Sequence, residues 1–173
     1  MIKTILYPTD LGIYSTYMLQ QVLALAEDNN ARVVIMHAVE PIGVFADAVL
    51  ETYVPREMMG ELKAYGLDAV MGAIRDQVLE AFHQELIDSP YDVGRIVDMR
   101  VVKGQPADMI LQEAIAVGAD LITLGSSGTL RDMPLLGATT SKVLQLSQIP
   151  VYMIPVAYTQ HYAHDAGERR SSL

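Results

Sequence analysis

Short apolar runs alternate along the chain with longer segments in which apolar residues recur at helical spacing, and this alternation continues to about residue 156. The apolar runs have the length and composition of buried strands, and they span 3–7, 32–39, 96–102, 120–124 and 151–154. The longer segments read as helices, and they span 14–28, 67–87, 105–117 and 139–147. Strands that alternate with helices form a parallel sheet with right-handed crossovers. We therefore predict an α/β fold, a doubly wound five-stranded parallel sheet of order 3-2-1-4-5 with helices on both faces.

The pattern fits a single domain over residues 1–156. At 173 residues the chain is long enough to bury a core, and 51% hydrophobic with 19% charged residues is typical of a globular protein. Residues 157–173 lack apolar periodicity, so we predict a flexible polar C-terminal tail. His161, His164 and Asp165 in this tail have the spacing of a one-turn metal clasp, although polar runs of this kind are more often simply solvated.

The composition excludes several classes of function. The chain has no cysteine, which excludes disulfides, thiolate catalysis and zinc–thiolate sites. Its net charge of −9 argues against nucleic acid as a partner, because phosphate backbones are normally bound by a basic stripe. The first residues lack the long apolar segment of a signal peptide, and no apolar run approaches the ~18 residues of a membrane helix. We therefore predict a cytoplasmic protein without a membrane partner.

A glycine-rich loop follows the fourth predicted strand. Gly125 and Gly128 enclose two serines directly after the run 120–124, and Gly137 stands at the start of the next helix. Glycines let main-chain N–H groups approach a phosphate or ribose, and a helix N-terminus attracts anions. In the predicted strand order, the loops after strands one and four meet where the order reverses, which is where doubly wound sheets bind ligands. The pattern predicts a nucleotide site, although the loop taken alone is equally typical of an ordinary strand-to-helix turn.

Three segments of the sequence resemble the universal stress protein family. They are residues 5–10 (ILYPTD), residues 33–37 (VVIMH) and the region 119–151, and the resemblance extends over roughly 1–156. Nucleotide-binding members of this family carry the pattern Gly-x2-Gly-x9-Gly-Ser/Thr, whose first half is matched by Gly125 and Gly128. The chain departs from the pattern twice, because its spacer 129–136 has eight residues instead of nine and Ala138 replaces the usual hydroxyl residue.

The resemblance implies a dimeric stress-response sensor or adaptor that binds ATP, with or without Mg²⁺, or a related adenine nucleotide. Asp10 would bind the ribose hydroxyls or a metal-bound water, Ala38 would lie at the adenine edge, and the helix start at Gly137 would hold the phosphates. The implied cofactor-binding residues are Pro8, Thr9, Asp10, Ala38, Leu124, Gly125, Ser126, Gly128, Gly137, Ala138, Thr139 and Thr140. The last strand, Val151 to Ile154, would pair with its copy in a second subunit. An unidentified protein partner is also implied.

Other interpretations of the same residues stay open. Asp10 can cap a turn instead of binding a ligand, and His37 is expected to be a hydrogen-bonded core histidine at the end of a buried strand. The short spacer and Ala138 support an alternative, a universal stress protein that has lost ATP and acts only through protein contacts. Adenylating enzymes, pyrophosphatases and flavodoxin-like carriers are disfavoured, because their phosphate loop follows the first strand. No catalytic residue and no metal site are identified, so any enzymatic activity is at most slow ATP hydrolysis or self-phosphorylation.

Overall fold

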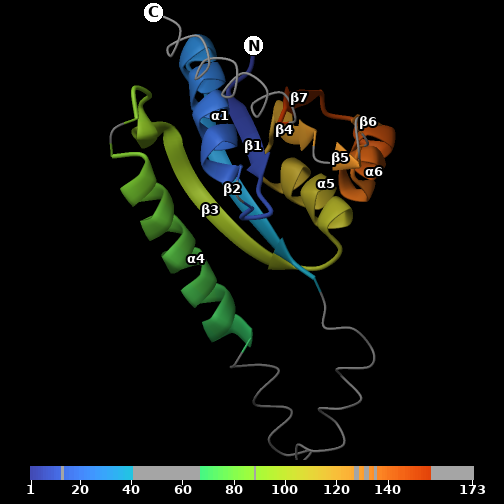
Figure 1. Ribbon diagram of the computed structural model, residues 1–173, viewed down its shortest axis with the longest axis horizontal. Helices are drawn as coiled ribbons and strands as arrows, with labels where there is room; N and C mark the ends of the chain where they lie inside the picture. Colours follow the sequence, from blue (N-terminus) through green and yellow to red (C-terminus); the bar gives the residue numbers. More distant parts are fainter. Residues whose placement is uncertain are drawn as a thin grey trace, which may run out of the picture.

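The computed structural model describes residues 1–12, 14–40, 67–87, 89–126, 129–130, 133–134 and 136–156. Five parallel strands form the central sheet: β1 (Thr4–Pro8), β2 (Arg32–Val39), β3 (Ile96–Lys103), β4 (Leu121–Ser126) and β7 (Val151–Pro155). Their order is β3-β2-β1-β4-β7, which confirms the predicted arrangement with β7 as the fifth strand (Figure 1). The order reverses at β1, which pairs with β2 on one side and β4 on the other.

Helices cover both faces of this sheet, as predicted. Four are described: α1 (Ser15–Asn29), α4 (Leu67–Glu85), α5 (Pro106–Ala116) and α6 (Ala138–Leu146). Side chains of α1 and α4 pack into one apolar core, whereas side chains of α5 and α6 pack into a second core on the opposite face. Figure 1 shows α4 running alongside β3 at one edge of the sheet. The other edge strand is β7.

The central strand divides its side chains between the two cores. Ile5 and Tyr7 belong to the core under α1, and Leu6 belongs to the core under α5. All three side chains are essentially inaccessible to solvent. This division follows from the two-residue period of a strand, and burial on both faces explains why the strand sequences are almost uniformly apolar.

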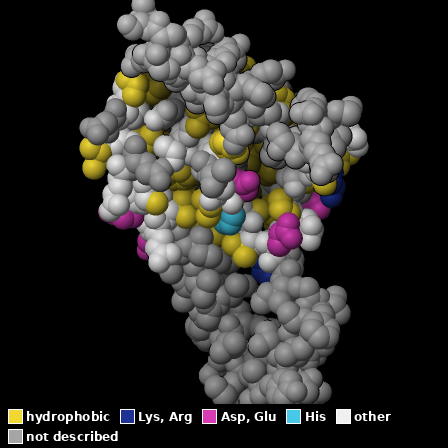
Figure 2. Space-filling view, viewed as in Figure 1, with side chains coloured by type: hydrophobic (Ala, Val, Ile, Leu, Met, Phe, Trp, Pro, Cys, Tyr) yellow, Lys and Arg dark blue, Asp and Glu magenta, His cyan; other side chains and the backbone are white. Residues whose placement is uncertain are grey.

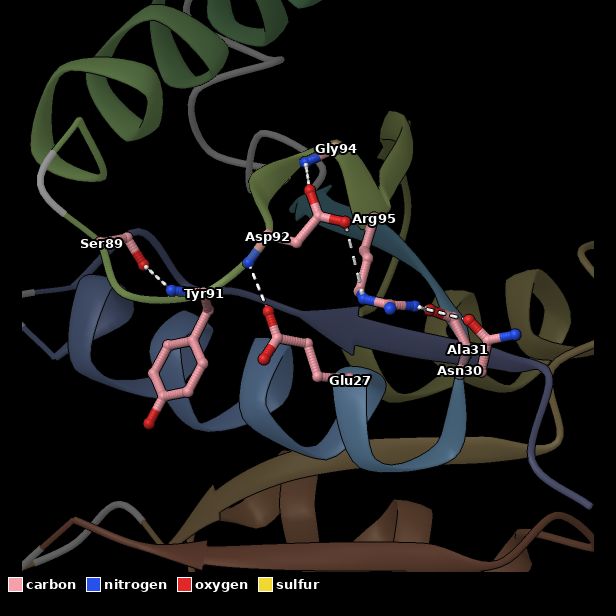
Figure 3. A network of polar contacts seen from close by, with 8 residues as sticks. All are labelled: Glu27, Asn30, Ala31, Ser89, Tyr91, Asp92, Gly94 and Arg95. Carbon is pink, nitrogen blue, oxygen red and sulfur yellow. Dashed lines mark hydrogen bonds and ion pairs between the residues drawn. The ribbon is translucent and has the colours of Figure 1, made fainter.

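A polar network joins the end of α1 to the short 3-10 helix η2 (Val93–Arg95) that precedes β3 (Figure 3). The Glu27 carboxylate accepts a hydrogen bond from the backbone N–H of Asp92. Arg95 Nη1 donates to the Ala31 carbonyl at 3.2 Å and to Asn30 Oδ1 at 3.3 Å. These bonds link segments about sixty-five residues apart in the sequence. They fix the amino ends of β2 and β3, at the end of the sheet opposite the carboxyl ends of the strands.

Two features were not predicted from the sequence. The 3-10 helix is one, and the other is a pair of two-residue antiparallel strands, β5 (Thr129–Leu130) and β6 (Met133–Pro134), within the spacer after β4. Residues 41–66, Gly128 and the predicted tail at 157–173 lie outside the described residues, so the tail and the domain limits stay predictions. None of the described helices is both long and apolar enough to cross a membrane.

Candidate functional site

A crevice of about 450 Å³ opens at the carboxyl ends of β1, β2 and β4, bounded by the first turns of α1, α5 and α6. The predicted site residues that line it are Pro8, Thr9, Asp10, Ala38, Leu124, Gly125, Gly137, Ala138, Thr139 and Thr140. Figure 2 shows one face of the molecule, on which a histidine and acidic side chains stand among hydrophobic surface. The structure thus brings the loop after β1 and the end of β4 together, as the strand order predicts, while the ligand-binding role of these residues stays a prediction.

The loop after β1 is held in place by hydrogen bonds to Thr9, a buried residue. Its backbone N–H donates to the Met36 carbonyl at 2.8 Å, continuing the pairing of β1 with β2. Its hydroxyl lies 3.0 Å from the hydroxyl of Ser15 and accepts from the Leu11 N–H at 3.0 Å. Tyr7 lies beneath, and its hydroxyl donates to the Ser15 carbonyl at 2.9 Å. The loop is therefore fixed to the start of α1 before any ligand arrives.

Asp10 forms a tight turn at the mouth of the crevice. Its Oδ1 accepts from the backbone N–H of Gly12 at 2.9 Å, and Leu11 between them has a left-handed φ of 58°. A Cβ on Gly12 would lie 3.0 Å from Asp10 Oδ1, so the glycine permits this close approach. Asp10 therefore stabilises a turn, as the interpretation of Asp10 as a turn cap predicts. Its exposed carboxylate also lines the crevice.

His37 lies in the wall of the crevice at the end of β2. Its Nδ1 is 2.8 Å from the Thr9 carbonyl oxygen. Because a carbonyl only accepts, Nδ1 carries a proton and donates this bond. The expected hydrogen bond is present, but the ring is only partly buried, so the prediction of a core histidine is wrong in that respect. The bond pins the β1 loop to β2.

The end of β4 forms the opposite wall, through Leu124 and Gly125. A Cβ on Gly125 would lie 3.2 Å from Cγ2 of Val156 and 3.4 Å from the end of the Met18 side chain. Gly125 therefore allows close packing between β4 and its neighbours. Ser126, which was predicted to bind the cofactor, is not among the lining residues; its Oγ accepts from the backbone N–H of Val156 at 3.1 Å. In this structure Ser126 ties β4 to the end of β7.

The amino end of α6 closes the crevice. Gly137 is the N-cap residue and provides no side-chain cap, and the first turn contains no acidic residue. The first intrahelical bond runs from the Ser141 N–H to the Gly137 carbonyl at 2.9 Å, so the N–H groups of Ala138, Thr139 and Thr140 are not used inside the helix. Such a helix start is suited to an anion.

The charged side chains among the described lining residues of the crevice are acidic. Asp10 and Glu40 line it, and no described lining residue is Lys or Arg. Within the described part of the chain, no three His, Asp or Glu side chains are grouped so that they could hold a metal ion.

Several lining residues were not identified from the sequence, among them Tyr7, Gly12, Ser15, Met18, Met36, Glu40, Pro106, Ile110 and Val156. What most of these residues share is their position in the sequence, near the end of a predicted strand or the start of the helix that follows it. A second hollow, of about 350 Å³, lies between α4 and β3 over Phe82 and Met99. It contains none of the predicted site residues.

Comparison with known proteins gives a consistent result. The model of the universal stress protein family matches residues 1–155. A Thermus aquaticus protein, described as the universal stress protein in the QAH/OAS sulfhydrylase 3′ region, is 28% identical over 155 residues, which cover 89% of this chain and 99% of the relative.

Solved structures share the fold. Hypothetical protein MJ0577 is 25% identical with a TM-score of 0.58, and the match covers 90% of this chain and 96% of that chain. A universal stress protein in complex with cAMP is 20% identical with a TM-score of 0.56, covering 88% and 96%. A universal stress protein from Lactobacillus plantarum is 21% identical with a TM-score of 0.58, covering 88% and 97%. At these identities the last two matches show the fold alone.

Proposed function

This chain belongs to the universal stress protein family, and on that premise we propose that it binds ATP or a related adenine nucleotide in the crevice. The observation that carries the proposal is that the β1 loop and the start of α6, which are far apart in the sequence, line one hollow. The β1 loop with Asp10 faces the start of α6 at Gly137, and both line the same space. This is the position at which doubly wound sheets bind nucleotides. A structure with the same fold has cAMP as its ligand.

Each part of the crevice suits one part of a nucleotide. The Asp10 carboxylate is an acceptor for ribose hydroxyls, and Ala38 at the end of β2 leaves room for a flat base. Leu124 offers an apolar surface against the base or ribose. The unused N–H groups at the start of α6 suit a phosphate, and Thr139 of the same turn lines the crevice.

The proposed role is that of a dimeric sensor or adaptor in the cytoplasm, in which the bound nucleotide alters a surface read by a protein partner. The dimer would form through β7, which is an edge strand of the sheet and presents Tyr152 with 48% of its surface exposed. Edge strands carry unpaired backbone groups that favour strand addition. Chemistry on the nucleotide is limited in this proposal to slow hydrolysis or self-phosphorylation.

Paired substitutions at Ala138 test the nucleotide site. Ala138→Asp places a carboxylate in the first turn of α6, which favours the helix but repels a phosphate at the same place. Ala138→Ser restores the hydroxyl usual in the family. In an isothermal titration with Mg·ATP and AMP, we expect the Asp variant to bind at least about tenfold more weakly and the Ser variant a few-fold more tightly, from one charge-assisted hydrogen bond. Equal affinities of all three proteins would refute the assignment of the phosphate position.

A family member that binds no nucleotide is the second candidate, and Ala138 together with the short spacer favours it. Native mass spectrometry of gently purified protein separates the two. A mass increase equal to an adenine nucleotide supports the first function. Unliganded protein that also fails to bind any adenine nucleotide at millimolar concentration supports the second.

A further inference from the structure

The charges around the crevice limit what kind of nucleotide it accepts. Asp10 and Glu40 contribute two carboxylates, both on exposed residues, and the described lining residues include neither Lys nor Arg. The lysine of α6, Lys142, is paired with Asp108 at 2.7 Å. Lys142 is therefore engaged by a carboxylate outside the crevice.

The positive potential that the described residues offer comes from the start of α6. A helix N-terminus is equivalent to about half an elementary charge, and its free N–H groups here belong to three consecutive residues, 138–140. That number of donors fits the oxygens of a single phosphate. Further phosphates would meet no compensating charge from the described lining, while Asp10 and Glu40 repel each added negative charge.

Building on the proposed function, we infer that the crevice selects adenine nucleotides that bear a single phosphate over free ATP. AMP carries about two negative charges at neutral pH, cAMP about one, and free ATP about four. Mg²⁺ removes two charges from ATP and keeps most of its other ligands as water and phosphate oxygens. The metal therefore brings ATP close to the charge of AMP and weakens the discrimination.

The size of the effect follows from Coulomb's law. For charges about 10 Å apart at a hydrated surface, two carboxylates acting on two additional ligand charges change the affinity by about tenfold at low salt. Screening over a Debye length of about 10 Å at 0.1 M salt reduces this factor to about threefold. The preference for AMP over ATP should therefore narrow as salt is added.

The test measures dissociation constants of the full chain for AMP, cAMP and ATP in EDTA at 20 mM salt, and for ATP with excess Mg²⁺. A double variant, Asp10→Asn with Glu40→Gln, removes both carboxylates and retains side chains that can hydrogen-bond. The matched control, Asp28→Asn with Glu80→Gln, removes the same net charge from exposed positions of α1 and α4 outside the crevice lining. The readout is the ratio of the ATP and AMP constants, because the absolute affinity of the Asp10 variant also reflects its proposed ribose contact.

We expect wild-type and control proteins to bind free ATP about tenfold more weakly than AMP. They should bind cAMP at least as tightly as AMP, and excess Mg²⁺ should remove most of the difference between ATP and AMP. In the crevice variant, which lacks both carboxylates, the ratio should fall to about one. Free ATP binding as tightly as AMP, or a ratio unchanged in the crevice variant, overturns this inference and leaves the proposed function standing. If none of the nucleotides binds, the proposed function itself fails.

Discussion

The hydroxyl of Tyr7 provides a sharp test of how the floor of the crevice is built. Tyr7 is 1% exposed, and its hydroxyl donates at 2.9 Å to the carbonyl of Ser15, the first residue of α1. Tyr7→Phe keeps the ring in the core and removes the hydroxyl together with this buried bond. We expect the free energy of unfolding at pH 7 to fall by about 1–2 kcal/mol, the usual cost of losing a buried neutral hydrogen bond.

The same residue gives a second, pH-dependent signature. Burial raises the pKa of Tyr7 to about 12, whereas an unfolded tyrosine has a pKa of about 10. Above pH 10 the unfolded chain loses this proton while the native protein keeps it, so the stability contributed by Tyr7 is lost as pH rises. At pH 11 this difference amounts to about 1.4 kcal/mol. Phenylalanine has no such proton, so the deficit of the variant should nearly vanish at pH 11.

Urea unfolding followed by far-ultraviolet circular dichroism at pH 7 and pH 11 measures both quantities. Tyr91→Phe is the control, since that ring is only partly buried and lies outside the proposed dimer strand, and we expect its stability to stay within about 0.5 kcal/mol of wild type. Two results would refute the reasoning. One is a Tyr7→Phe variant as stable as wild type at pH 7, and the other is a deficit that does not shrink at high pH.

Three further predictions concern other parts of the molecule. Asp120 Oδ2 accepts from the backbone N–H groups of Lys3 at 2.8 Å and Thr4 at 3.0 Å, and these bonds lower the pKa of its carboxyl. Asp120→Asn should therefore be less stable than wild type in urea at pH 7, and the gap should close as pH falls below about 4; a constant gap would contradict this. Tyr152→Lys, on the edge strand β7, should shift the proposed dimer to monomer in analytical ultracentrifugation, with an unchanged circular dichroism spectrum. Arg95→Leu removes the donor that joins η2 to the end of α1, so the free energy of unfolding should fall by about 1–2 kcal/mol. An unchanged free energy of unfolding would show that these hydrogen bonds do not stabilise the protein.

The fold could be predicted from the sequence because its determinants are local and repetitive. Strands that are buried on both faces have almost entirely apolar sequences. The right-handedness of crossover connections leaves few possible strand orders in the sheet. The short strands β5 and β6 were not predicted because a strand of two residues is too short to show a periodic pattern.

The site was predictable in outline for the same reason. Topology brings the ends of β1 and β4 together, whatever the side chains are. Which side chains line the crevice depends on long-range contacts, and local sequence patterns do not indicate these contacts. Ser126 bonds to the backbone N–H of Val156, thirty residues away, and does not line the crevice. The partial exposure of His37 follows from its place at the open end of β2, where the burial of the apolar run ceases.

The central claim is that an adenine nucleotide binds in this crevice, and a titration followed by ¹H–¹⁵N correlation spectroscopy tests it most directly. The account predicts that, as AMP is added, backbone amide signals of Thr9, Ala38, Gly125 and Thr139 shift together and saturate with one dissociation constant. These residues lie on four different segments of the chain, and all four line the crevice. Shifts confined to the hollow between α4 and β3, or no saturable shift at millimolar AMP, would contradict it.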